Sequence, residues 1–107
     1  MSAKLEYTRR EIRVYLEGEI DHHSASLIRA GIDDAIILRR PKLLILNFEG
    51  VSFMDSSAIG LVMGRYKLMK THEGEIRVEG LSPSAYKVMK LAGIERLGEI
   101  RVKEAAV

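Results

Sequence analysis

The chain has 107 residues, 47% of them hydrophobic and 30% charged, which fits one globular domain over residues 1–107. It contains no cysteine, no apolar run long enough to span a bilayer and no signal-peptide core. Thiolate catalysis, cysteine-ligated zinc and a membrane span are therefore excluded, and we expect a cytoplasmic protein. Seventeen Lys and Arg are interspersed with fifteen Asp and Glu, for a net charge of +2. Because nucleic-acid-binding domains concentrate their cations on one face, no nucleic-acid partner is expected.

The N-terminal third predicts two strands and a helix. Apolar and polar residues alternate from Glu11 to Gly18, which is typical of a strand with one buried face. A weaker strand is expected over Lys4–Thr8, so that the two form a hairpin. Apolar residues then recur at helical spacing from Ser24 to Leu38, and Ser24 is a candidate N-cap. Pro41 ends this helix, because proline disfavours helical geometry in the residue before it.

The middle of the chain predicts a buried strand and a second helix. Residues Lys42–Phe48 are nearly all apolar, as expected of a central strand that is covered on both faces. A helix is predicted over Ser57–Thr71, since apolar residues again follow helical spacing. Its predicted apolar stripe consists of Ile59, Val62, Met63, Tyr66 and Met69.

The C-terminal third predicts a strand at Glu75–Glu79, a third helix and a last short strand at Glu99–Val102. Ser82 is the expected N-cap of that helix, Pro83 its first residue and Gly93 its C-terminal stop. The order β-β-α-β-α-β-α-β predicts an α/β domain. Its mixed, mostly parallel sheet should carry the helices through right-handed crossovers.

The segment that joins the most apolar strand to the second helix is the first place to look for a site, since sites in open α/β sheets lie at the carboxyl ends of strands. It contains Asp55-Ser56-Ser57. One interpretation is that one of the three simply caps the helix. A catalytic serine would need a general base, yet His72 lies about 24 Å away along the same helix, and no Gly-x-Ser-x-Gly elbow is present.

Other classes of site find less support. Asp21, His22 and His23 carry metal-ligating side chains, but adjacent residues of an extended segment point to opposite sides, so no metal is expected. The sequence has no Gly-rich phosphate loop ahead of a lysine, and we expect neither a cofactor nor enzymatic activity. Gly60 and Gly64, four residues apart on one helix, would allow a neighbouring backbone to come close, either from the sheet or from a partner. A small enzyme or nucleotide-binding domain that uses Asp55, Ser56 and His22 is the alternative from a different functional class.

Ser56 could instead be modified by another protein. A phosphate at this serine would add about −1.5 to −2 charges. It would face the positive end of the helix dipole, which stabilises an anion by about 0.3–1 kcal/mol. Phosphorylation of Ser56 should therefore leave the fold intact. Its effect would fall on docking, because a bulky dianion beside Asp55 repels an acidic partner and blocks close packing.

The run Phe53–Lys67 closely resembles the signature of the anti-sigma factor antagonists, which are STAS domains. The run Gly18–Ala25, with its Asp-His-His, resembles the segment ahead of the first helix in the sporulation branch of that family, which acts on sigma-F. The resemblance extends from about Glu11 to Arg101. It implies a STAS fold and a non-enzymatic regulator.

The resemblance also implies a cycle. The unphosphorylated protein would bind an anti-sigma factor that is a serine kinase carrying ADP or ATP, and so release the sigma factor. The kinase would phosphorylate Ser56 and let go, and a metal-dependent serine phosphatase would restore the protein. The alternative within the family is the STAS domain of a general stress-response system, which has no special use for the Asp-His-His run.

Several residue roles follow from the same match. Asp21 and the loop around it, including His22, would lie beside Ser56 and contact the kinase. Asp55 would cap the second helix or engage the partner, and Ser57 would neighbour the acceptor. The remaining residues implied on or near the docking face are Gly60, Gly64 and Arg65.

The sequence departs from the family at two points. Ala58 stands where the family commonly has glycine, which adds a methyl group at the start of the helix. The chain ends soon after the last predicted strand, where relatives usually continue into a further helix, and Lys103–Val107 could supply little more than one turn.

Overall fold

The computed structural model describes residues 2–103, which form five strands, three α-helices and one short 3₁₀ helix. The strands are β1 (Ser2–Tyr7), β2 (Glu11–Ile20), β3 (Leu43–Met54), β4 (Glu75–Leu81) and β5 (Glu99–Val102). The helices are α1 (His22–Arg39), α2 (Ser57–Lys70), α3 (Pro83–Leu91) and the 3₁₀ helix η1 (Ile94–Arg96). This order confirms the predicted alternation of strands and helices.

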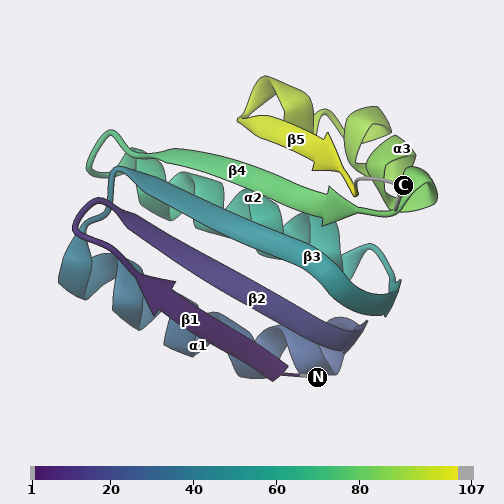
Figure 1. Cartoon of the computed structure of the whole chain (residues 1–107), viewed down its shortest axis with the longest axis horizontal. Coiled ribbons are helices and arrows are strands. Elements are labelled where there is room, and N and C mark those ends of the chain that lie inside the picture. The colour runs from purple at the N-terminus through teal and green to yellow at the C-terminus, as the bar shows by residue number, and fades with distance from the viewer. Residues whose placement is uncertain (1, 104–107) are drawn as a thin grey trace.

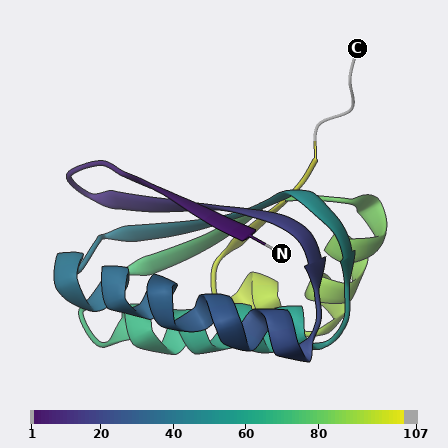
Figure 2. The ribbon, with the colours of Figure 1, turned by 90° about the horizontal axis from the view of Figure 1, so that it is seen from below.

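The five strands form one mixed sheet in the order β1-β2-β3-β4-β5 (Figure 1). β1 is antiparallel to β2, and the other neighbouring strands are parallel, as predicted. Figure 2 shows α1 and α2 side by side against one face of the sheet. Within residues 2–103, none of the helices is long and apolar enough to cross a membrane.

A single hydrophobic core lies between this face of the sheet and the helices. Alternate residues of the central strands supply one side of it, and they are Ile12, Val14, Leu16, Leu44, Leu46, Phe48, Ile76 and Val78. The helices supply the other side, chiefly through Ala25, Ile32, Ala35, Ile36, Leu61, Val62 and Met69. Burial of each large apolar side chain contributes about 1.5–3 kcal/mol. The core therefore fixes the positions of α1 and α2 on the sheet.

Neither α1 nor α2 packs on the opposite face of the sheet. Helices therefore cover β3 on one face only, whereas the sequence predicts that helices cover both faces. Ile45 lies on the opposite face, outside the core cluster, yet it is 0% exposed. It pairs with Arg13 of β2 and with Arg77 of β4. The long side chains of such neighbours cover apolar surface with their aliphatic stems. The apolar composition of this strand thus reflects its central position rather than a second layer of helices.

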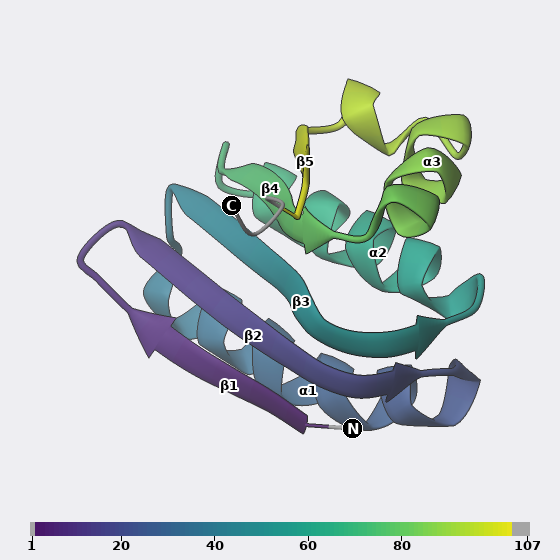
Figure 3. The same cartoon turned by 45° about the vertical axis from the view of Figure 1, so that its right-hand side comes forward.

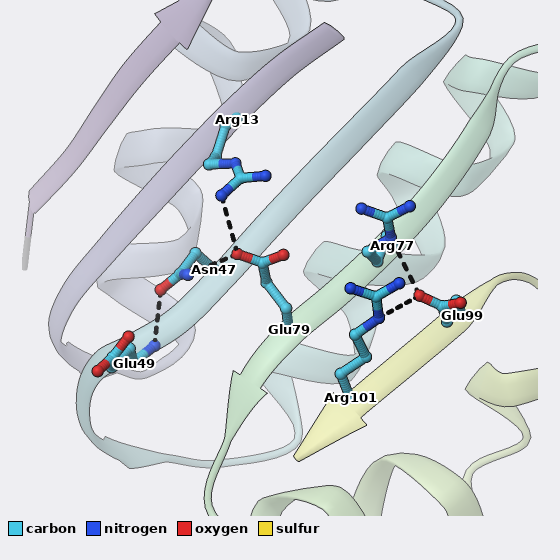
Figure 4. A network of polar contacts seen from close by, with 7 residues as sticks. All are labelled: Arg13, Asn47, Glu49, Arg77, Glu79, Glu99 and Arg101. Carbon is cyan, nitrogen blue, oxygen red and sulfur yellow. Dashed lines mark hydrogen bonds and ion pairs between the residues drawn. The ribbon is translucent and has the colours of Figure 1, made fainter. Parts of the chain in front are cut away.

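Polar side chains on this uncovered face pair with one another (Figure 4). Glu79 Oε2 accepts a hydrogen bond of 2.8 Å from Asn47 Nδ2 and lies 3.4 Å from Arg13 Nη1. Asn47 Oδ1 in turn accepts from the backbone N–H of Glu49 at 3.0 Å. A second group joins Arg77, Glu99 and Arg101. Such surface pairs add little stability each, so their main effect is to satisfy the charges of the face internally.

The central strands run further than the sequence predicts. β2 continues past Gly18 to Ile20, and β3 continues past Phe48 to Met54. Two register shifts in the β2–β3 ladder interrupt the apolar alternation that marks a strand. The exposed Glu17 and Glu19 mask the continuation further. Because of this extension, the N-cap of α1 is Asp21 and not Ser24, which is instead the third residue of a capping box.

The buried side of α2 also differs in part from the predicted stripe. Val62 and Met69 are buried as expected, whereas Met63 is 39% exposed. Leu61 and Arg65 are buried instead. The reason is that α2 packs against α1 as well as against the sheet, which buries a second side of the helix that the apolar stripe does not reveal.

The predicted limits of α3 are confirmed. Ser82 Oγ accepts from the Ala85 N–H at 3.1 Å, and Pro83 occupies the first turn. Gly93 follows the helix with a φ of 83°, a left-handed conformation that glycine adopts without strain. The expectation for Lys103–Val107 concerns a segment that lies, apart from its first residue, outside the described residues.

A substitution at Gly98 tests the packing of the segment before β5 against β4 directly. A Cβ at Gly98 would collide with the carbonyl oxygen of Ile76, which cannot move without disturbing β4. We predict that Gly98→Ala lowers the free energy of unfolding by about 1–3 kcal/mol, the usual cost of overpacking. Gly31→Ala is the matched control, because a Cβ at this exposed helical position meets no atom within 4 Å. It should raise stability by about 0.5–1 kcal/mol. Urea denaturation followed by circular dichroism measures both, and equal effects of the two substitutions would contradict the packing described.

Candidate functional site at the carboxyl ends of β2 and β3

The parallel pairing of β2 with β3 brings two connections to the same end of the sheet (Figure 3). Ile20 and Met54 pair at the last position of the two strands. One residue later, the Asp55 N–H donates a hydrogen bond of 3.1 Å to the Ile20 carbonyl. The starts of α1 and α2 therefore adjoin, and the two segments singled out in the sequence, around Asp21 and around Ser56, belong to one surface.

Asp21 holds the start of α1 in place. Its Oδ1 accepts from the Ser24 N–H at 2.8 Å, and Ser24 Oγ accepts from the Asp21 N–H at 2.9 Å. The Ser24 hydroxyl also donates to the Glu19 carbonyl at 3.0 Å. Because Ser24 hydrogen-bonds to the charged form, first through its backbone N–H, the pKa of the exposed Asp21 carboxyl lies below its ordinary value. The loop thus presents a fixed negative charge next to the exposed His22.

Asp55 performs the capping at the start of α2, and this leaves Ser56 free. Asp55 Oδ1 accepts from the Ser57 N–H at 2.8 Å. Ser56 occupies the N-cap position but makes no side-chain capping bond. Its side chain is exposed, and its hydroxyl has no hydrogen-bond partner among residues 2–103. An unengaged hydroxyl therefore stands at the positive end of the α2 dipole.

The residue that departs from the family pattern points away from this surface. Ala58 is 0% exposed and belongs to the hydrophobic core. Its methyl group therefore fills space inside the domain. The partly buried Ser57 lies between this core residue and the exposed Ser56.

A groove of about 350 Å³ runs between α1 and α2 from this end of the sheet. Its lining residues are His22, Ala25, Ser26, Arg29, Ser57, Gly60, Leu61, Gly64 and Arg65. A Cβ at Gly60 or Gly64 would meet no atom within 4 Å. Close approach of the sheet therefore does not require these two glycines, in contrast to one of the two explanations offered by the sequence.

Arg65 is placed differently from an ordinary docking side chain. It is only 6% exposed, and its Nε lies 2.7 Å from Oδ1 of Asp33 on α1, a close ion pair without hydrogen-bond geometry. Burial raises the pKa of the Asp33 carboxyl against the opposing charges of Arg65 and Arg29, and burial lowers the pKa of Arg65. Arg65 Nη1 is buried and has no hydrogen-bond partner among the described residues, which costs about 1–3 kcal/mol. The resemblance thus identified a groove residue whose main contact in the fold is to the other helix.

The sequence analysis did not identify Ser26 or Arg29 as part of this surface, nor Asp33 as the ion-pair partner of Arg65. They lie on the side of α1 that faces α2, as the groove lining and the ion pair to Arg65 show. The spacing of Arg29 and Asp33, four residues apart on one helix, is the one signal that could have drawn attention to them.

The histidines are not hydrogen-bonded to Ser56 among residues 2–103. His72 Nε2 instead lies 2.7 Å from the Pro41 carbonyl oxygen. The same residues contain no cluster of three side chains that could hold a metal ion. What the site offers chemically is an accessible hydroxyl, two fixed carboxylates and an adjoining groove.

The model of the STAS domain family matches residues 3–106 of this chain. The anti-sigma F factor antagonist of Lysinibacillus sphaericus is 40% identical over 87 residues, which cover 81% of this chain and 74% of that protein. The anti-sigma F factor antagonist of Paenibacillus polymyxa is 32% identical over 97 residues, which cover 91% of this chain and 83% of that protein.

Two solved structures of a similar protein share this fold. The anti-sigma factor antagonist SpoIIAA in its unphosphorylated form has a TM-score of 0.81 and 37% identity, over 92% of this chain and 87% of that one. The Bacillus cell fate determinant SpoIIAA in the phosphorylated form has a TM-score of 0.75 at the same identity, over 92% and 90%. Sequence and structure agree throughout the domain, and the chain belongs to the STAS domain family, among its anti-sigma factor antagonists.

Proposed function

We propose that this protein is a phosphorylation-controlled antagonist of an anti-sigma factor that is itself a serine kinase. The unphosphorylated form binds the kinase and so frees the sigma factor, and phosphorylation of Ser56 ends the binding. A metal-dependent serine phosphatase then restores the active form. The observation that carries the proposal is the exposed Ser56 at the start of α2, whose hydroxyl makes no capping hydrogen bond. The similarity to an antagonist solved in unphosphorylated and phosphorylated forms supports it.

The chemistry of the switch is a transfer of one phosphoryl group. The bond between Ser56 Oγ and the γ-phosphorus of ATP forms, the bond from that phosphorus to the leaving oxygen breaks, ADP departs and the hydroxyl proton is lost. The kinase supplies ATP and catalysis, so this protein contributes the acceptor alone. The phosphate would lie at the α2 N-terminus, where the helix dipole stabilises an anion.

The same position explains why modification would act on docking and not on folding. The structural hydrogen bonds at the helix start belong to Asp55, and Ser56 makes none of them through its side chain. A phosphate there adds bulk and about −1.5 to −2 charges to the surface formed with Asp21 and Asp55. A partner that packs closely against this surface must desolvate that charge, which weakens its binding.

The proposed docking surface combines the helix starts with the groove. His22 and Ser57 line the groove, the exposed Asp21 directly precedes His22, and Gly60 and Gly64 leave the α2 backbone without side chains along the groove. Such a surface can accept a segment of the kinase at short distance, because no side chains project from the two glycines. In this proposal the protein acts by binding its partner and catalyses no reaction itself.

Incubation with the cognate anti-sigma factor and ATP tests the phosphoacceptor. We predict one added phosphate, about 80 Da, on Ser56 by mass spectrometry of the digested protein. Ser56→Ala should remain bound and unmodified, and Ser56→Asp should bind at least tenfold more weakly. Ser57→Ala is the matched control and should still be labelled at Ser56. Labelling at another residue, or full binding by Ser56→Asp, would contradict the proposal.

The two glycines allow stability and binding to be separated. Gly60→Ala and Gly64→Ala should each raise the free energy of unfolding by about 0.5–1 kcal/mol, because alanine favours the helix and the methyl group meets no neighbour. Each should nevertheless weaken binding to the anti-sigma factor at least tenfold, measured by calorimetry, because the methyl group occupies the groove. Gly31→Ala should stabilise the fold without this loss. Unchanged affinity in both groove variants would show that the partner docks elsewhere.

The alternative within the family is a role in a general stress response. Exchange of the partner distinguishes the two. The protein should bind a sporulation anti-sigma F factor at least tenfold more tightly than an anti-sigma-B factor under the same nucleotide and salt conditions. The reverse preference would favour the stress-response role.

A further inference from the structure

We infer that the groove between α1 and α2 receives a carboxylate side chain of the anti-sigma factor, which pairs with the guanidinium group of Arg65. This inference rests on the proposed function and deepens it, because it specifies the chemistry of the partner at one point of contact. The surface of the partner must then carry an aspartate or glutamate that enters the groove.

The first argument is the unmet hydrogen-bonding capacity of Arg65. Its side chain is more than nine-tenths buried and lines the groove, yet within residues 2–103 its one ion pair is with Asp33. Nη1 has no hydrogen-bond partner among the described residues. Buried polar groups are nearly always paired, so an unpaired donor in a groove indicates an acceptor that arrives from outside.

The second argument is the local balance of charge. Arg29 also lines the groove, and its charge acts on both Asp33 and Arg65. The groove lining thus includes two guanidinium groups and no carboxylate, and Asp33, which pairs with Arg65, lies outside the lining. Asp34, the other nearby acid, is exposed and does not line the groove. A carboxylate from the partner would balance the second guanidinium charge, and it could bind an arginine through two parallel hydrogen bonds.

The third argument is access. Gly60 and Gly64 leave the α2 side of the groove without side chains, and the groove encloses about 350 Å³. A partner chain can therefore approach the helix backbone near Arg65. Nη1 itself is shielded from solvent, so docking must displace the side chains that cover it.

The sign of the charge also differs between the two ends of the docking surface. Asp21 and Asp55 lie at the helix starts, whereas Arg29 and Arg65 lie further along the groove. A partner that meets both regions must present basic groups to the first and an acidic group to the second. Complementarity of this kind fixes orientation and excludes wrong partners.

The decisive variant is Arg65→Lys, which keeps a cation beside Asp33 but removes Nη1. We expect it to bind the purified cognate anti-sigma factor, with ADP, at least tenfold more weakly than the parent protein, by calorimetry. Asp33→Asn is the matched control, since it breaks the ion pair and retains the guanidinium group. It should lose stability in urea yet bind within threefold of the parent. Lys67→Gln, which removes an exposed cation of α2 outside the groove lining, should also leave affinity within threefold.

A double-mutant cycle identifies the carboxylate on the partner. Each surface aspartate or glutamate of the anti-sigma factor is replaced by its amide, and each variant is measured against the parent and against Arg65→Lys. We expect one replacement to weaken binding to the parent at least tenfold and to have little further effect on Arg65→Lys. Additive effects for every replacement would overturn the inference.

The outcomes separate the inference from the proposed function. Full affinity of Arg65→Lys overturns the inference and leaves phosphorylation of Ser56 standing. Equal losses in Arg65→Lys and Asp33→Asn also overturn it, because they assign the effect to the ion pair within the fold. A parent protein that does not bind the anti-sigma factor overturns both.

Discussion

The site depends on one constraint, the parallel ladder between β2 and β3. This ladder places Ile20 opposite Met54, and a hydrogen bond from Asp55 to Ile20 continues the contact past the last paired residues. Because parallel strands end at the same edge of a sheet, α1 and α2 must begin next to each other. The core beneath fixes both helices on the same face. Every element of the proposed switch is positioned by this arrangement.

At the start of α2, the residue that caps the helix differs from the residue that we propose is phosphorylated. Helix starts require acceptors for their free N–H groups, and Asp21 and Asp55 supply them. Ser56, although it occupies the N-cap position, contributes no side-chain bond. A charge can therefore be added to its hydroxyl at little cost to the helix. The burial of Ala58 beside it keeps the backbone of this turn anchored in the core.

Local patterns in the sequence predict most of the fold, because hydrophobic periodicity and caps are local signals. Ser82 and Pro83 identify the start of α3 correctly, since both act within one turn. The sequence does not predict the ends of β2 and β3, because their ladder continues through bulges and exposed glutamates. The exposure of Met63 and the roles of Asp33 and Arg65 depend on how α1 packs against α2. That packing is a long-range contact, which the hydrophobic periodicity of either helix does not encode.

The uncovered face of the sheet has a practical consequence. Its polar side chains pair among themselves, as Glu79 and Asn47 do, and this face lies across the sheet from α1 and α2 and the groove between them. The chain contains no cysteine, so a cysteine introduced at the exposed Arg101 would be its sole thiol. A fluorophore attached there would report complex formation through tumbling rate or energy transfer while both helices stayed unlabelled. The uncovered face thus offers a position for a single label in single-molecule measurements.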